Sequence, residues 1–295
     1  MKKVKNILVV MDLPRQRQMA MHRGIALARD LGAHLHLAAF VHHEMYDQKD
    51  VFETHQRRAV REALEHERER WLRDRVKDAG LAAGDVTIEV VWEKDIHEWV
   101  KQACDEGRYD LVLKSAHNSK TLVHTPTDWH LLRDCPVPVL IATSSKWPAK
   151  ARVLAAVDPT RKDRNHRKLN MKVVETAQAF AETHDAEVHI GWTVAAPEVL
   201  SDLDVIDPEK YRTQLVETMK PRLEEIADQF GIPHERIHIH KGKPGVALSG
   251  LAAKLKAELI VLGTIARKGV SGMVVGNTAE KVLTAARCDI ITVKP

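Results

Sequence analysis

The feature that most constrains the fold of this 295-residue chain is a long internal repeat. Asn6–Asp12 (NILVVMD) returns as Arg152–Asp158 (RVLAAVD), and Ala26–His36 returns as Ala179–His189. Two further blocks follow in the same order: Tyr109–Leu113 as Ala257–Val261, and Cys135–Ile141 as Cys288–Val293. Four matched blocks in one order predict two copies of a single domain. We expect the first copy over residues 1–145 and the second over 150–295.

Within each copy, short apolar runs alternate with segments of helical periodicity. In the first copy we expect strands near 6–11, 34–41, 86–92, 110–114 and 138–142, and helices near 16–31, 54–79, 95–106 and 126–134. Continuous apolar strands that alternate with helices are typical of a parallel sheet covered on both faces. The predicted class is therefore α/β, with two tandem copies of an open five-stranded parallel sheet.

Composition excludes several other classes of protein. No apolar run approaches the ~20 residues of a membrane span, and Asp12 and Pro14 follow the first apolar run where a signal peptide would be cleaved. The net charge of +4 is spread over mixed acidic and basic segments, which argues against nucleic acid as a partner. Three widely spaced cysteines fit a reducing compartment. We therefore expect a cytoplasmic protein with no membrane and no nucleic-acid partner.

Ligands of open parallel sheets bind beyond the carboxyl ends of the strands, at a switch point in strand order. In the second copy this rule selects the loops after Val157 and Leu262 and the turn at Gly276. Asp158 ends the first strand of that copy, where its carboxylate could accept hydrogen bonds from a ligand or cap the Asp-Pro-Thr turn. Both interpretations stay open for Asp158, whereas capping is favoured for Asp12.

The stretch LGTIARKGVSGMVVGNTAEKV, from Leu262 to Val282, joins an apolar run to a helical pattern. It lacks the lysine and hydroxyl residue of a Walker loop and the tight glycine spacing of a dinucleotide fingerprint. Gly263 and Gly276 instead bracket a loop that contains Arg267, and a helix begins at Asn277 and Thr278. Glycines and a helix N-terminus suit a phosphate, although the two glycines could equally serve turns alone.

The twofold pattern, the Asp after the first strand and this loop together resemble the universal stress protein family in its tandem form, over essentially the whole chain. The nucleotide-binding branch of that family carries glycine, two residues, glycine, nine residues, and glycine followed by Ser or Thr. Here Gly263 and Gly276 keep that frame, while Ala266 replaces the second glycine and Asn277 replaces the hydroxyl residue.

The resemblance implies an adenine nucleotide α-hydrolase-like fold, a stress-response role, and binding of ATP or another adenine nucleotide in the second copy, with magnesium if the ligand is ATP. The residues it assigns to the nucleotide are Val157, Asp158, Leu262, Gly263, Arg267, Gly276, Asn277 and Thr278. It also implies that the last strands, near 137–142 and 290–294, pair within the chain as a pseudo-dimer. A homodimer remains an alternative.

The corresponding stretch of the first copy, Lys114–His130, has no glycine and contains Pro126, which has no amide hydrogen to offer an anion. We expect no nucleotide there. Side chains could fill the first copy's pocket, or it could take a lipid or another metabolite.

Other clusters of polar residues predict no further chemistry. His238 and His240 would point to one face of a strand, which we expect to be an exposed polar face, and His42, His43 and Glu44 follow another strand, but neither group makes a recognisable metal site. We assign Cys104, Cys135 and Cys288 to packing. No nucleophile, base and oxyanion arrangement can be traced, so we expect no catalytic residues and no metal ligands. A weak ATPase is the enzymatic alternative.

Overall fold

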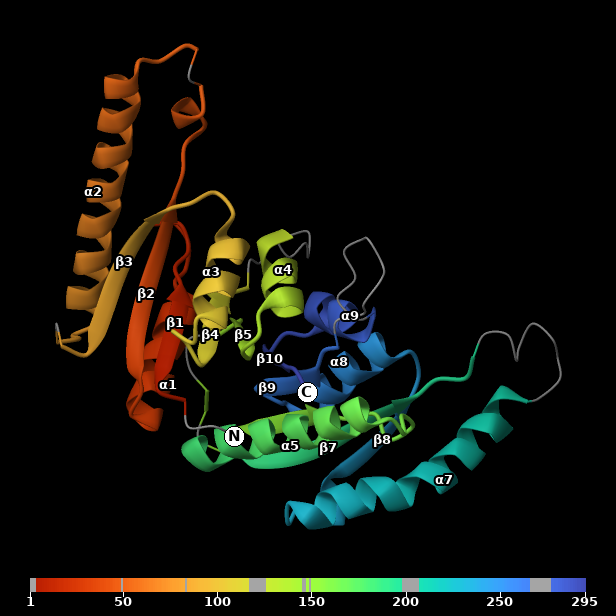
Figure 1. Ribbon diagram of the computed structural model, residues 1–295. Helices are drawn as coiled ribbons and strands as arrows, with labels where there is room; N and C mark the ends of the chain where they lie inside the picture. Colours follow the sequence, from red (N-terminus) through yellow and green to blue (C-terminus); the bar gives the residue numbers. More distant parts are fainter. Residues whose placement is uncertain are drawn as a thin grey trace. The chain divides into compact units, whose positions relative to one another are not determined.

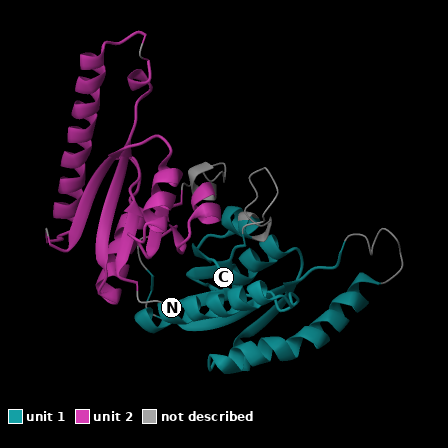
Figure 2. Ribbon diagram, viewed as in Figure 1, with its two compact units in different colours: residues 1, 117–124, 147–295 teal, residues 2–116, 125–146 magenta. Residues whose placement is uncertain are grey.

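The computed structural model describes residues 4–48, 50–82, 84–116, 126–144, 147–148, 150–197, 207–265 and 277–295, with the backbone alone at 126–129, 277, 278 and 280. The chain divides into two compact units, residues 2–116 with 125–146 and residues 147–295 among those described (Figure 2). These units contain the first and second copies.

The first copy contains five parallel strands in the order β3-β2-β1-β4-β5 (Figure 1). The strands are β1 (Asn6–Val10), β2 (His34–Val41), β3 (Val86–Trp92), β4 (Leu111–Ser115) and β5 (Val139–Ala142). Between them lie α1 (Met19–Leu31), the short η1 (Glu44–Tyr46), α2 (Thr54–Asp78), α3 (Ile96–Asp105) and α4 (Pro126–Asp134).

The second copy repeats this arrangement in the order β8-β7-β6-β9-β10, again parallel throughout. Its strands are β6 (Arg152–Ala156), β7 (Glu187–Val194), β8 (Ile237–Lys241), β9 (Leu259–Gly263) and β10 (Asp289–Val293). Its helices are α5 (Arg164–His184), α7 (Pro208–Gln229), the short η2 (His234–Arg236), α8 (Pro244–Leu255) and α9 (Asn277–Ala285). The predicted fold class is thus confirmed.

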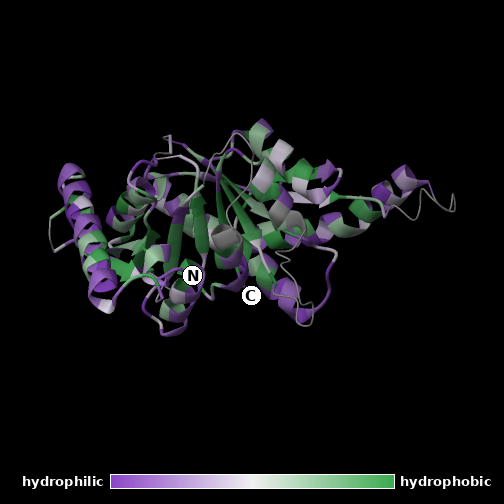
Figure 3. Ribbon diagram, turned by 90° about the horizontal axis from the view of Figure 1, so that it is seen from above, coloured by the Kyte–Doolittle hydropathy of each residue, from purple (hydrophilic) through white to green (hydrophobic). Residues whose placement is uncertain are grey.

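Burial explains why these segments became strands and helices. Every residue of β4 and β10 is buried, as expected for parallel strands that are covered on both faces. Right-handed crossovers place α1 and α2 on one face of the first sheet and α3 and α4 on the other. In Figure 3 the strands are green and the long α2, at the left, is largely purple, which matches a helix with Leu72 as its one fully buried side chain.

The observed boundaries lie within a few residues of the predicted ones. The largest shift is at α1, which begins at Met19 rather than near 16, because Gln18 and Gln16 hydrogen-bond within the preceding turn. No helix in the described part of the chain is both long and apolar enough to cross a bilayer.

Candidate functional site

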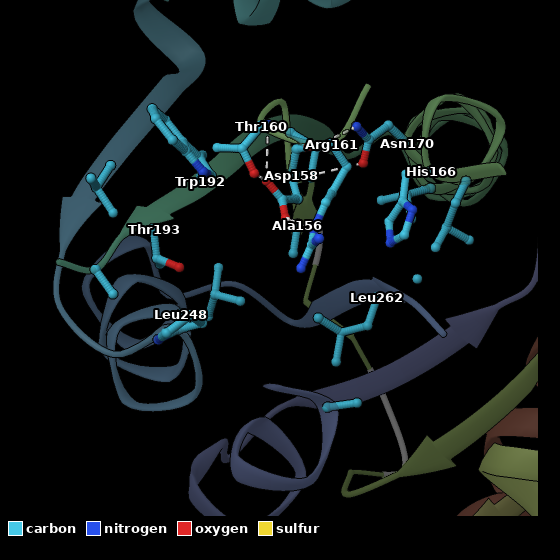
Figure 4. Close-up of a pocket in the computed structure, with 18 of the residues that line it drawn as sticks. Ala156, Asp158, Thr160, Arg161, His166, Asn170, Trp192, Thr193, Leu248 and Leu262 are labelled. Atoms are coloured by element: carbon cyan, nitrogen blue, oxygen red, sulfur yellow. Dashed lines mark hydrogen bonds and ion pairs between the residues drawn. The ribbon is translucent and has the colours of Figure 1, made fainter. Parts of the chain in front are cut away.

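A cavity of about 780 Å³ opens at the carboxyl ends of β6 and β9 in the second copy (Figure 4). These strands are neighbours at the point where the strand order reverses, which is where parallel sheets bind ligands. Residues from the loop after β6, from β7 and β9, and from α5, α7, α8 and α9 line the cavity. They include Val157, Asp158, Thr160, Arg161, His166, Asn170, Trp192, Thr193, Tyr211, Leu215, Pro244, Leu248, Leu262, Gly263, Thr264 and Ala279.

Asp158 takes part in a turn and also faces the cavity. Its Oδ1 accepts hydrogen bonds from the Thr160 backbone N–H at 3.0 Å and from the Thr160 hydroxyl at 2.5 Å. Its Oδ2 lies 3.9 Å from Nε of Arg161, and the Asp158 side chain is 49% exposed. The predicted turn contacts are therefore present, and the second oxygen stays open to the cavity.

Asn170, on the first turns of α5, fixes the end of β6. Its amide oxygen accepts from the Asp158 backbone N–H at 3.0 Å, and its amide nitrogen donates to the Asp158 carbonyl at 2.8 Å. Because Asn170 is buried, this pair of bonds holds the backbone of Asp158 in one position. The carboxylate is thus presented by a rigid support.

Gly263 ends β9 where α5 approaches most closely. A Cβ added to Gly263 would lie 2.5 Å from the side chain of Leu169, so a larger residue would displace α5 or its side chain. Glycine at this position therefore allows α5 to pack closely against the end of β9. The sequence pattern predicts that this glycine lets a phosphate approach the backbone, and that stays a prediction.

Positive charge and helix N-termini meet at the cavity. The labelled side chains of Arg161 and His166 extend into the space above Leu262, with Trp192 and Thr193 on the other side (Figure 4). Pro244 and Ala279, which lie in the first turns of α8 and α9, also line the cavity. Helix N-termini and a guanidinium favour an anion.

The predicted nucleotide residues fall into three groups. Val157, Asp158, Leu262 and Gly263 line the cavity together. Asn277 and Thr278 are the first two residues of α9. Arg267 and Gly276 lie outside the described residues.

Sequence reasoning missed the contributions of α5, β7 and α7. Trp192 and Thr193 lie at the end of the strand next to β6, so the carboxyl-end rule could have selected them. Arg161 follows Asp158 by three residues and was visible as part of a basic segment. Tyr211 and Leu215 come from α7, and the repeat contains no signal that would have identified them.

The equivalent position in the first copy contains an internal ion pair. Lys114 lies beside Val10 in the sheet, as Leu262 lies beside Ala156 in the second copy. Its Nζ is 3.4 Å from Oδ1 of Asp12, and the two side chains are 7% and 1% exposed. Ser115 replaces Gly263, and its hydroxyl accepts a hydrogen bond from the Ala20 backbone N–H at 2.9 Å.

The histidine clusters form no metal site within the described residues, where no three His, Cys, Asp or Glu side chains gather to hold an ion. The expectation that His238 lies on an exposed strand face was wrong, because its Nε2 lies 2.9 Å from Nδ1 of buried His189. Burial first, and then His238, lower the pKa of His189 to about 4. His240 is exposed, as predicted.

A model of the universal stress protein family matches residues 3–143 and again residues 151–294. Together with the strand order that repeats in the two copies, this match shows that the chain belongs to the universal stress protein family, as a tandem member. Among its relatives, universal stress protein E of Salmonella typhi is 32% identical over 297 residues, which cover 99% of this chain and 94% of the relative. The universal stress protein E homolog of Haemophilus influenzae is 25% identical over 303 residues, covering 99% and 98%.

Solved structures show the same architecture along the whole chain. A protein of unknown function from Pseudomonas aeruginosa PAO1 superimposes with a TM-score of 0.71 at 26% identity, covering 99% of this chain and 93% of that one. A universal stress protein from Archaeoglobus fulgidus DSM 4304 has a TM-score of 0.65 at 18% identity, covering 98% of each chain. At that identity the likeness concerns the fold alone.

Proposed function

We propose that the second copy binds an adenine nucleotide in the cavity beside Asp158, and that the chain acts as a ligand-sensing or interaction module in the stress response. The observation that supports this most is the cavity itself. It combines a half-exposed carboxylate with Arg161, His166 and the first turn of α9 at the switch point of the sheet. Few ligands need a hydrogen-bond acceptor and anion-binding groups so close together, and a nucleotide is one of them.

The proposed roles follow from the chemistry of each wall. Oδ2 of Asp158 would accept a hydrogen bond from a base amine or a ribose hydroxyl. Trp192 and Leu248 would contact the flat base, while Arg161 and the amides of Asn277 and Thr278 would face the phosphates. Arg267 and Gly276 join this set through the glycine spacing alone. Magnesium would arrive with the phosphates of ATP, because the described residues offer it no ready-made cage.

Binding without rapid turnover is the function we propose. Among the described residues of the cavity wall, Asp158 is the one carboxylate, and its Oδ1 already accepts two hydrogen bonds from Thr160. We expect phosphate release from ATP to be slow. A cytoplasmic location and pairing of the two last strands within the chain are parts of the same proposal.

The first experiment denatures freshly purified protein and assays the supernatant for adenine nucleotides, then titrates ATP and magnesium back by calorimetry. Asp158→Ala should weaken binding by at least about tenfold, or about 1.4 kcal/mol, because one charged hydrogen-bond acceptor is lost.

Glu182→Ala is a matched control. It removes an exposed carboxylate near the end of α5, and Glu182 does not line the cavity. Absence of nucleotide both in the purified protein and after titration would refute the proposal. Equal binding by the Asp158→Ala and Glu182→Ala proteins would refute the role of Asp158.

A lipid or metabolite in the first copy is the weaker alternative. There the Asp12–Lys114 ion pair occupies the position that corresponds to the cavity wall.

A further inference from the structure

Two thiols of the first copy lie side by side in its core. Cys104 is in the last turn of α3 and Cys135 directly follows α4, so 31 positions separate them along the chain. Their Sγ atoms are 3.7 Å apart, and the two residues are 5% and 1% exposed. The spacing of the two cysteines matches no known cysteine motif, so sequence reasoning did not find this pair.

We propose that Cys104 and Cys135 form an intramolecular disulfide when a peroxide oxidises the protein, so that the first copy carries a redox modification site. In the first step one thiol sulfur attacks a peroxide oxygen, the O–O bond breaks, and a sulfenic acid and one water form. In the second step the other thiol attacks the sulfenic sulfur, the S–O bond breaks, and the disulfide and a second water form. Two thiols lose two electrons, and hydrogen peroxide accepts them.

The geometry favours the second step over further oxidation. A disulfide needs the sulfurs about 2.05 Å apart, so they must approach by roughly 1.7 Å, which side-chain rotation and small helix shifts can supply. The resolving thiol is already in contact with the sulfur that would become a sulfenic acid. A second peroxide, in contrast, must reach the same buried place from solvent.

The same burial makes the first step slow. The hydrogen bond with Cys135 and then desolvation raise the pKa of Cys104, so little thiolate forms while the core is closed. Oxidation should therefore occur through brief openings of α3 and α4. We expect these thiols to react far more slowly than an exposed cysteine, and to respond to sustained rather than momentary exposure.

The second copy provides an internal control. Cys288 corresponds to Cys135 in the repeat, and the position of Cys104 is taken by Ala252, which is buried. Burial raises the pKa of Cys288 to about 12, and burial also contributes to the raised pKa of Cys104. Cys288 is less buried than Cys104 and Cys135, and the repeat puts an alanine where its partner sulfur would lie.

The test treats the full-length reduced protein with excess hydrogen peroxide, alkylates the remaining thiols under denaturing conditions, and maps them by mass spectrometry without reduction. We expect the number of free thiols to fall from three to one, with Cys288 alkylated and one peptide pair joined through Cys104 and Cys135. A dithiol reductant should restore all three. Cys104→Ala should give no crosslinked peptide pair over the same exposure, because the second thiol of the disulfide is gone.

A second measurement distinguishes a disulfide of the folded protein from one made in unfolded chains. The bridge closes a loop across α4, so the oxidised protein should melt at a higher temperature than the reduced one. The proposal is overturned if all three thiols persist while free cysteine is fully oxidised, or if Cys104 or Cys135 becomes sulfinic acid without crosslinking. A crosslinked protein that melts at a lower temperature would overturn it as well.

Discussion

The ends of β4 and β9 occupy equivalent places in the two copies, yet a buried ion pair lies at the end of β4 and a cavity lies at the end of β9. In the first copy Lys114 reaches Asp12 within the core, where both side chains are buried. In the second copy Leu262 takes the place of Lys114, and Asp158 faces a cavity of about 780 Å³. A carboxylate follows the first strand in both copies, but Asp12 is buried against Lys114, whereas Asp158 lines a cavity.

This comparison shows how one strand order can give the same carboxylate two different surroundings. In the first copy a cation of the chain itself lies beside the carboxylate, and in the second copy the carboxylate lines a cavity. The sheet order and the strand register stay the same in both copies. The first copy carries a different feature, the cysteine pair that we propose as a redox modification site.

Breaking the ion pair should have the largest effect on stability. Lys114→Met removes a cation that lies 3.4 Å from the buried Asp12 carboxylate, and such a change typically costs about 3–5 kcal/mol. Urea unfolding can be followed by fluorine NMR on fluorotryptophan-labelled protein, with Trp99 as the reporter of the first copy and Trp192 of the second. The loss should appear at Trp99.

The matched control is the double variant Asp12→Asn with Lys114→Met, which removes both charges. It should recover most of the lost stability, because the buried carboxylate no longer needs a cation. If the double variant is as unstable as the single one, Lys114 stabilises the first copy through the packing of its stem and not through its charge.

The ion pair also shows how far sequence reasoning extends. The strands were predictable because continuous apolar runs of four to six residues have few other uses. Lys114 stands as the one charge within the run LVLKS, and it was a visible signal that the first copy departs from the second. Its partner Asp12 is 102 positions away, and such pairings depend on strand order, which periodicity does not specify. The wall that α7 contributes to the cavity was hidden for the same reason.

Acidification should distinguish the two copies through a pair of equivalent histidines. His189 corresponds to His36, and burial is the main cause that lowers the pKa of each. Because the folded pKa of His189 is about 4, below the ordinary value near 6.5, the unfolded chain binds the proton more readily. Its contribution to stability is complete above about pH 6.5 and is lost as the pH falls toward 4.

The second copy should therefore lose about 3 kcal/mol over this interval, and more than the first copy. His238, Arg236 and Arg152 all oppose the added proton, while Glu187 alone favours it. The check is urea unfolding at pH 7 and pH 4.5 with the same tryptophan reporters. His189→Asn, which keeps a polar partner for His238, should flatten the pH dependence at Trp192. An unchanged slope would place the acid sensitivity elsewhere.

The smallest expected difference lies at the ends of α1 and α5. Each helix ends in the left-handed conformation, at Gly32 with φ 61° and at Asp185 with φ 48°. Glycine adopts this conformation without the steric cost that a Cβ adds. Asp185→Gly should therefore stabilise the second copy by about 0.5 kcal/mol, and Gly32→Asp should destabilise the first by about as much. Opposite shifts of the urea midpoints at Trp192 and Trp99 would confirm that the two helix ends have the same conformational preference for glycine. A midpoint lowered by Asp185→Gly would show instead that the Asp185 side chain stabilises its turn by more than the strain costs.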